Sequence, residues 1–146
     1  MSNVKILRLK REAHLPSRGS AAATGFDLYA CMDEPVVLTG QPQLIPCGIA
    51  IASPEDIDTQ IRPRSGLTLK GVVAAFGTID ADYRGELFVT MYVLPDCDEH
   101  VVQSGDRIAQ LVFSALPRVV MTEVFDQSDL SSTARGSGGH GSTGDR

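Results

Sequence analysis

The sequence predicts an all-β fold, and three observations lead to this class. Short apolar and β-branched runs recur along the chain, and turn-forming residues bound each of them. Glycine contributes 14 and proline 8 of the 146 residues, a heavy load for a helical bundle. No stretch sustains an apolar stripe with the 3.6-residue period of a helix. Because an α/β fold would need helical crossovers, we expect a sandwich or jelly roll.

The predicted strands follow one another at short intervals along the chain. The first alternates apolar and polar residues with period two, and the later ones are short apolar runs. Turn signals such as Thr39–Pro42 and Gln103–Asp106 separate them, and Ser65–Lys70 alone predicts a helical turn. The nine predicted strands are Val4–Leu9, Phe26–Ala30, Val36–Leu38, Leu44–Ile51, Thr59–Arg62, Val72–Phe76, Glu86–Leu94, Arg107–Ser114 and Val119–Phe125.

The length and the change in composition near the C-terminus predict one domain followed by an arm. A chain of 146 residues suits a single domain. From Asp126 the sequence becomes polar, and residues 134–146 hold five of the fourteen glycines without a larger aliphatic side chain. We therefore expect a domain over residues 1–125 and a flexible, glycine-rich arm over residues 126–146.

Composition and charge exclude several classes of protein. A hydrophobic content of 42% is enough for a core and rules out a wholly disordered chain. The formal net charge of −5 argues against a general nucleic-acid coat protein, which would show a basic footprint. It leaves room for one small anionic ligand held by a local arginine cluster.

The cysteines and the N-terminus favour a cytoplasmic protein. Cys31, Cys47 and Cys97 are odd in number, widely spaced and without a C-x-x-C pattern. This usage fits idle thiols in a reducing compartment better than a disulfide framework or a zinc site. The first ten residues alternate apolar and basic side chains and lack the apolar block of a signal peptide. No stretch approaches the ~20 apolar residues of a membrane span, so we expect no membrane association.

The C-terminal arm carries a glycine pattern that suits phosphate. Gly136-x-Gly138-x-x-Gly141 matches a dinucleotide fingerprint, but no strand–helix unit follows it. The same stretch resembles a phosphate loop that lacks the expected lysine. Glycines let backbone N–H groups approach phosphate oxygens closely, and an arginine offers a bidentate fork. Further donors in the arm are Arg135, Ser137, Ser142 and Thr143, and His140 is the one ring that could stack on a base.

A second segment, Arg62–Leu67, combines two arginines and a serine at a strand end that also contains a proline and a glycine. Such a strand end makes a compact anion site, because guanidinium groups bind phosphate with two parallel hydrogen bonds. A solvated loop is an equally good interpretation of this hexapeptide taken alone.

A third segment, Gly77–Gly85, contains two aspartates, Asp80 and Asp82. In an extended chain both point to the same face, which would suit a paired-carboxylate acid–base site. Aspartate is also a common turn residue, so a hairpin tip is an alternative. Spacing alone does not say which aspartate would be placed on a water.

Two smaller signals are single polar residues inside apolar strands. Asp27 lies within Thr24–Tyr29, where a buried carboxylate needs a partner such as a hydrated metal ion. Gln110 lies within Gly105–Leu111 and must find hydrogen bonds, either in the core or to a ligand. Satisfaction within the core is the better interpretation of each in isolation.

Taken together and in this order, five segments resemble the five motifs of the trimeric dUTPase family. The resemblance implies a distorted jelly-roll β-sandwich or barrel subunit and a homotrimer with three shared active sites. In that family each site takes motifs one, two and four from one subunit, motif three from a second and motif five from a third. The matching segments are Ala23–Ala30, Pro63–Leu67, Gly77–Glu86, Gly105–Leu111 and Arg135–Gly144.

The resemblance also implies an activity. Family members hydrolyse dUTP to dUMP and pyrophosphate with Mg²⁺ on the phosphates, which provides dUMP for thymidylate synthesis and keeps uracil out of DNA. Asp80 would be the general base for water attacking the α-phosphorus, and Tyr83 would pack on the deoxyribose. Asp27 would bind waters on the Mg²⁺. The phosphates would be held by Arg64, Ser65, Gly66, Gln110 and Arg135, with help from Gly141, Ser142 and Thr143.

Recognition of the base departs from the family pattern. Many bacterial relatives carry an asparagine three residues before the glycine of motif three, where this chain has Ala74. We therefore expect the main chain of a Val72–Thr78 hairpin to read uracil, and His140 to stack on it where many relatives carry phenylalanine. The remaining positions expected to contact substrate are Ala74, Gly77, Thr78 and Ile79.

Two other function classes compete with this interpretation. The dCTP deaminases share the fold, but the Pro63–Leu67 segment and the glycine-rich arm suit hydrolysis of dUTP. A non-catalytic nucleotide-binding trimer would not need an intact Asp80. A purely structural jelly roll would not need Arg64, Asp80, Tyr83 and Arg135 together.

Overall fold

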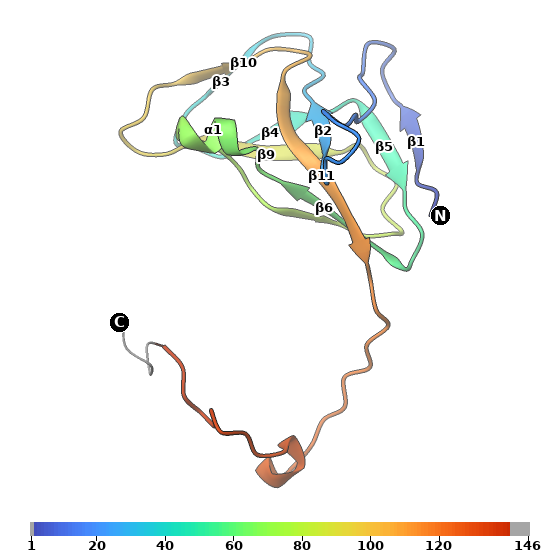
Figure 1. The fold of residues 1–146 in the computed structure, drawn as a ribbon. Helices are drawn as coiled ribbons and strands as arrows, with labels where there is room; N and C mark the ends of the chain where they lie inside the picture. The colour runs from blue at the N-terminus through green and yellow to red at the C-terminus, as the bar shows by residue number, and fades with distance from the viewer. Residues whose placement is uncertain (1, 141–146) are drawn as a thin grey trace.

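Strands account for nearly all of the regular structure. The computed structural model describes residues 2–140, and within them lie eleven strands, one short α-helix and one 3-10 helix (Figure 1). The predicted all-β class is therefore confirmed, as is the helical turn after Arg64, but η1 is a second helical turn that the sequence did not predict. The elements are β1 (Lys5–Arg8), β2 (Phe26–Tyr29), β3 (Val36–Leu38), β4 (Gln43–Pro46), β5 (Ile49–Ala52), β6 (Ile57–Arg62), α1 (Ser65–Leu69), β7 (Val72–Ala74), β8 (Gly77–Ile79), β9 (Phe88–Val93), β10 (His100–Val102), β11 (Arg107–Ala115) and η1 (Gln127–Leu130).

The strands form four antiparallel sheets. The largest has the order β2-β11-β6-β8, a second has the order β4-β9-β7, and two strand pairs, β1-β5 and β10-β3, complete the body. Over the described residues these sheets do not close into a single barrel. No helix in residues 2–140 is long and apolar enough to cross a membrane.

The register of the four-stranded sheet brings distant segments together. β11 runs between β2 and β6, and Gln110 on β11 lies opposite Asp27 on β2 and opposite Arg62 on β6. A β-bulge between Arg107 and Ala109 shifts the β11–β2 register just before this point. The sheet thus places three chemically interesting segments side by side, although they are far apart in the sequence.

The core consists of aliphatic side chains from all four sheets. Alternation is clear on β9, where Val89, Met91 and Val93 are buried and the residues between them are more exposed. Each such side chain contributes about 1.5–3 kcal/mol by leaving water. Thr59 is buried as well, and its hydroxyl forms a 2.8 Å hydrogen bond with that of Ser53. The largest fully buried aliphatic residues are Leu28, Leu38, Ile45, Ile49, Leu87, Met91, Ile108 and Leu111.

The predicted strand Leu44–Ile51 is divided into β4 and β5. The break is at Gly48, whose φ of 67° lies in the left-handed region that favours glycine. A Cβ at this position would lie 2.7 Å from the Sγ of Cys31 and 2.9 Å from the Cβ of Ala13. Beyond the break β5 pairs with β1, whereas β4 pairs with β9.

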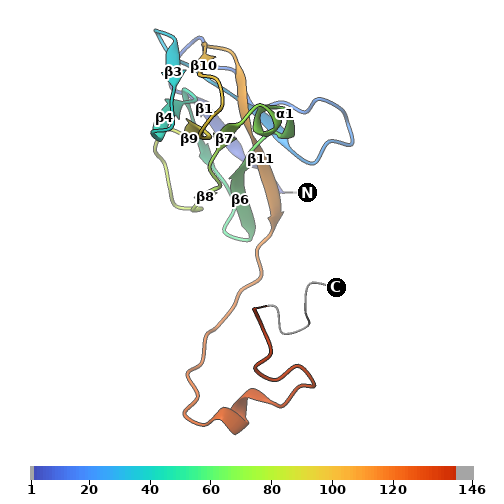
Figure 2. The same ribbon diagram turned by 90° about the vertical axis from the view of Figure 1, so that its left-hand side faces the viewer.

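The predicted strand Val119–Phe125 is wrong for this chain taken alone. After β11 the chain leaves the body and runs outward to η1 (Figures 1 and 2). Val120 and Phe125 are 89% and 90% exposed. The apolar pattern predicts burial in a sheet, but no sheet edge of the same chain meets this segment.

Candidate active site

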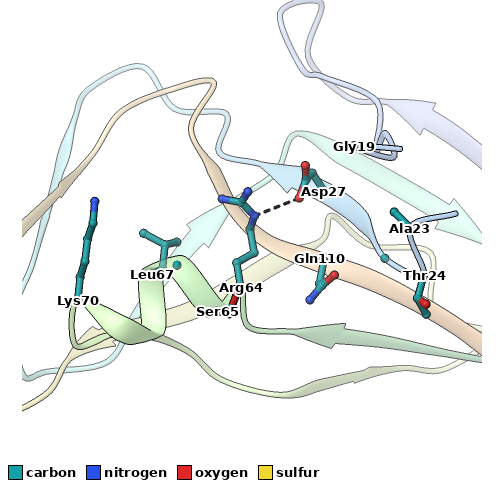
Figure 3. Close-up of a pocket in the computed structure, with 11 residues that line it drawn as sticks. Gly19, Ala23, Thr24, Asp27, Arg64, Ser65, Leu67, Lys70 and Gln110 are labelled. Carbon is teal, nitrogen blue, oxygen red and sulfur yellow. Dashed lines mark ion pairs between the residues drawn. The ribbon is translucent and has the colours of Figure 1, made fainter. Parts of the chain in front are cut away.

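A cavity of about 550 Å³ opens where β2, β6 and β11 meet the start of α1 (Figure 3). It gathers side chains from three of the segments that the sequence singles out: those of Asp27, of Arg64 and Ser65, and of Gln110. It is bounded by Gly19, Ala23, Thr24, Gly25, Asp27, Arg64, Ser65, Gly66, Leu67, Lys70 and Gln110.

Asp27 is held by two arginines. Its Oδ1 lies 3.1 Å from the Nε of Arg64, and its Oδ2 lies 3.7 Å from an Nη of Arg107. The carboxylate side chain is only 16% exposed, so these guanidinium groups offset the cost of removing its charge from water. The sequence leads us to expect a partner such as a hydrated metal ion or a group within the core, and the structure provides Arg64 and Arg107 in that role.

Arg64 is fixed at two of its nitrogens. Besides the Asp27 contact, Nη1 donates a hydrogen bond of 3.2 Å to the backbone carbonyl of Arg107. A guanidinium group has five N–H donors, so three remain for a ligand in the cavity. The backbone of Arg64 is extended, with φ −100° and ψ 131°, and its carbonyl accepts hydrogen bonds from the N–H groups of Leu67 and Thr68 in α1.

Gln110 connects its own strand with the segment before α1. Its Nε2 donates a 3.0 Å hydrogen bond to the carbonyl of Pro63, the residue before Arg64. One amide hydrogen is thus satisfied inside the protein, while the half-buried side chain still forms part of the cavity wall. The two interpretations left open by the sequence, a core contact and a ligand contact, are compatible.

The sequence did not single out Lys70, which also lines the cavity. Figure 3 shows its side chain rising at the end of α1, beyond Leu67. The predicted helical turn over Ser65–Lys70 is the sequence signal that could have identified Lys70, because one turn of helix returns the chain to the same side. With Arg64 it adds positive charge to the wall that carries Asp27.

The segment after β8 lies outside this cavity. Asp80 is exposed, and its carbonyl accepts a 3.0 Å hydrogen bond from the N–H of Tyr83, which closes a turn. Tyr83 donates its hydroxyl to the carbonyl of Glu86 at 2.8 Å. Its ring folds back over Gly85, where a Cβ would lie 2.6 Å from Cζ. Among the described residues that line the cavity, neither Asp80 nor Tyr83 is present.

The expected Val72–Thr78 hairpin takes a different form. β7 pairs with β9, whereas β8 pairs with β6, so the two strands belong to different sheets. Ala74 is 3% exposed, and a buried methyl group offers no hydrogen bond to a base. Gly77 and Ile79 are half-buried and Thr78 is exposed. None of these four lines the cavity among the described residues.

The C-terminal arm extends away from the body of its own chain (Figures 1 and 2). Arg135 is exposed and its Nε donates a 2.9 Å hydrogen bond to the carbonyl of Gly138. His140 is exposed as well. Gly141, Ser142 and Thr143 lie outside the described residues. The arm therefore contributes no described residue to the cavity of its own chain.

Comparison with known proteins shows to which family the chain belongs. A profile of the dUTPase family matches residues 11–144. The chain belongs to the dUTPase family. A protein of Rickettsia felis named deoxyuridine 5'-triphosphate nucleotidohydrolase is 44% identical over 149 residues, covering 99% of this chain and 98% of that one. A protein of the same name from Syntrophotalea carbinolica is 46% identical over 145 residues, covering 97% and 96%.

Solved structures with the same fold include dUTPases of bacteriophages. The dUTPase of Staphylococcus bacteriophage 80alpha, determined with dUpNHpp, has a TM-score of 0.81 and 25% identity, covering 97% of this chain and 98% of that one. A mutant dUTPase of phage phi11, described as coordinating a structural Mg(II) ion, has a TM-score of 0.75 and 22% identity over 86% and 99%. The resemblance inferred from the five segments is confirmed, as is the enzyme class, a dUTP diphosphatase.

The residues of the dUTPase cavity fit Mg²⁺ held mainly by a ligand. Within residues 2–140 no group of three or more His, Cys, Asp or Glu side chains is placed to hold a metal ion by itself. Mg²⁺ prefers oxygen ligands, keeps several waters, and commonly binds through one carboxylate together with substrate phosphates. Asp27 supplies such a carboxylate at the cavity wall.

Proposed function

We propose that this dUTPase hydrolyses dUTP to dUMP and pyrophosphate in active sites that three copies of the chain build together. One observation carries the proposal. The cavity of a single chain gathers Asp27, Arg64, Ser65, Gly66 and Gln110, yet it does not contain Asp80. Each chain therefore carries a wall that suits a triphosphate but lacks the catalytic base. We expect this arrangement of a site that is divided between subunits.

The phosphates bind on the wall that Arg64 and Ser65 form. The free N–H donors of Arg64 match phosphate oxygens in pairs. Asp27 holds this guanidinium in place through the 3.1 Å contact, so little rotational freedom is lost on binding. Ser65 and Gly66 add donors at the start of α1, and Gln110 adds the second hydrogen of its amide.

Hydrolysis depends on water placed by Asp80 of a second subunit. Asp80 accepts a proton from the water while the water oxygen attacks the α-phosphorus. The bond between the α-phosphorus and the oxygen that bridges to the β-phosphate then breaks, which releases pyrophosphate. Arg64 and Arg135 neutralise charge on the phosphates as the transition state forms. Mg²⁺ bound to the triphosphate would supply further charge neutralisation, and Asp27 would hold it through its waters. The exposed position of Asp80 at a turn suits delivery into a neighbour's cavity.

Selectivity for the sugar and the base comes from the motif-three segment. Tyr83 packs against the deoxyribose and leaves no room for a 2′-hydroxyl. Since Ala74 is buried, uracil is read by main-chain groups of the stretch that includes Gly77, Thr78 and Ile79. His140 stacks on the base from the arm, and Gly141, Ser142 and Thr143 assist Arg135 at the phosphates.

The proposal also covers assembly and place. The chain forms a jelly-roll domain over residues 1–125 and an arm over residues 126–146 that closes over a neighbouring subunit's site in a homotrimer. The exposed apolar side chains of Val119–Phe125 support this, because they find no partner in the described part of their own chain. The enzyme acts in the cytoplasm, where its three unpaired thiols stay reduced, and it supplies dUMP and removes dUTP before DNA synthesis.

The test is pyrophosphate release with Mg²⁺ from dUTP, measured beside UTP, dTTP and dCTP. We expect strong preference for dUTP. Equal rates with UTP or dTTP would contradict the proposed selectivity. Release of ammonia from dCTP would favour a deaminase instead.

A further inference from the structure

We propose that Gly25 is a positioning residue for Gln110, because the absence of a side chain at Gly25 leaves the space in which the Gln110 amide lies. The inference rests on the proposed function, since it assumes that this amide contacts the substrate phosphates. It assigns a specific role to the glycine that precedes β2.

The contact is closer than any side chain would allow. A Cβ built on Gly25 would overlap the Oε1 of Gln110 and would lie 2.8 Å from its Cδ and 3.1 Å from its Cβ. Rotation of the side chain does not change the last distance, because the Cβ of Gln110 is fixed to the backbone of β11, but rotation does move Oε1 and Cδ away. That strand is hydrogen-bonded on both sides, and its neighbours Ala109 and Leu111 are buried. The side chain of Gln110 would have to rotate away.

Rotation of Gln110 would dismantle a connection between three segments. In the structure its amide lies against Gly25, and its Nε2 donates to the carbonyl of Pro63 at 3.0 Å. Pro63 precedes Arg64, whose guanidinium is paired with Asp27 on β2. An amide turned away from Gly25 loses the bond to Pro63 and leaves the cavity wall.

Backbone conformation does not explain the glycine at this position. The φ of Gly25 lies outside the left-handed region, in contrast to that of Gly48, so alanine is compatible with the local chain. Crowding is also not general around the cavity. A Cβ at Gly19 or at Gly66 would meet nothing within 4 Å. The steric requirement is therefore specific to the Gly25–Gln110 contact.

A double-mutant cycle tests the proposal. We would prepare Gly25→Ala, Gln110→Ala and the double variant, and measure kcat/KM for dUTP and the affinity for dUpNHpp. Each single change should lower kcat/KM roughly 10- to 100-fold, the loss expected for one hydrogen bond to a charged group. The double variant should be no worse than Gln110→Ala within about twofold, because the bond and the two closest contacts, those with Oε1 and Cδ, disappear together, and a small shift accommodates the 3.1 Å Cβ contact that remains. Gly40→Ala is the control, since its Cβ would meet only the Val93 carbonyl at 3.8 Å.

A urea unfolding midpoint for each variant separates positioning from folding. If Gly25→Ala lowers the midpoint, the double variant should recover most of the loss, because Gln110→Ala removes Oε1 and Cδ, which make the two closest contacts. Multiplied losses in the double variant, or full activity in either single variant, would overturn the proposal. Absence of dUTP hydrolysis by the wild type would overturn the proposed function instead, and the cycle would still be read from dUpNHpp affinity.

Discussion

A single carboxylate, Asp80, distinguishes binding from turnover in this account. The residue lies at a turn, exposed, and away from the phosphate-binding wall of its own chain. Its proposed task is to accept one proton from water, and general bases contribute roughly 10²–10⁴-fold to the rate.

Asp80→Asn keeps the size of the side chain and removes the base. We therefore expect kcat, measured in stopped assays, to fall about 10³-fold or more. The affinity for dUpNHpp, measured by calorimetry, should be nearly unchanged. Asp82→Asn, two residues along the same turn, is the matched control and should retain activity. Loss of nucleotide binding in Asp80→Asn would assign the residue a different role.

Buried thiols give the residue scale a pH dependence. Burial raises the pKa of Cys47 from its usual 9.0 to about 12. In the unfolded chain this thiol ionises above pH 9, whereas in the folded protein it stays neutral up to about pH 12. Between these two pH values the thiol is ionised in the unfolded chain but neutral in the folded protein, which stabilises the unfolded state. The free energy of unfolding should therefore fall over this pH range.

Replacement of Cys47 should make that alkaline decline shallower. Urea midpoints measured from pH 8 upward would be compared between the wild type, Cys47→Ala and Cys97→Ala. Cys97 is exposed, so its replacement should leave the slope of the decline unchanged. An equal slope in all three proteins would show that Cys47 is not responsible.

At the scale of elements, strands with a clear apolar pattern could be predicted from the sequence. Strands and breaks that depend on tertiary contacts could not. β9 and β11 follow from their own alternation or apolar length, since burial of one face leaves a period of two. β8 and β10 were missed, because three-residue strands inside turn-rich stretches carry little signal. The break at Gly48 depends on contact with Cys31, which the local apolar run conceals.

The site shows the same division. That Asp27, Arg64 and Gln110 lie together agrees with the family resemblance, and the β11 register explains it physically. The ion pair of Asp27 with Arg107 and the presence of Lys70 at the cavity depend on side-chain directions in the folded chain. The sequence around Arg107 and Lys70 does not predict those contacts. The individual roles of the site residues stay predictions.

The arm is the element with the clearest test. Its described residues make local contacts only, such as the 2.8 Å cap from Asp126 to the N–H of Ser128. Deletion of residues 135–146 should therefore leave the urea midpoint and the number of chains in the assembly unchanged, while kcat/KM for dUTP falls about 10²-fold or more with the loss of Arg135 and of the proposed stacking of His140 on the base. Full activity after this deletion would contradict the role given to the arm.

At the scale of the whole molecule, we propose that the 146 residues of one chain supply one domain and only part of a working site. The net charge of −5 excludes a broad polyanion-binding surface, yet Arg64 and Lys70 concentrate positive charge at one cavity. We propose that Asp80 reaches such a cavity only from a second copy, so that each active site is divided between chains.

Mixing two inactive variants tests that claim most directly. Arg64→Ala and Asp80→Asn proteins would be unfolded together, refolded and assayed for pyrophosphate release from dUTP. Randomly assembled trimers should recover about a quarter of wild-type activity, because each mixed trimer contains one site with both residues intact. Arg64→Ala mixed with Gln110→Ala is the control and should show no more than the mean activity of the two separate variants, since both residues belong to the same wall. If the Arg64→Ala and Asp80→Asn mixture stays inactive although mixed trimers form, each site is built within one chain and the account is wrong.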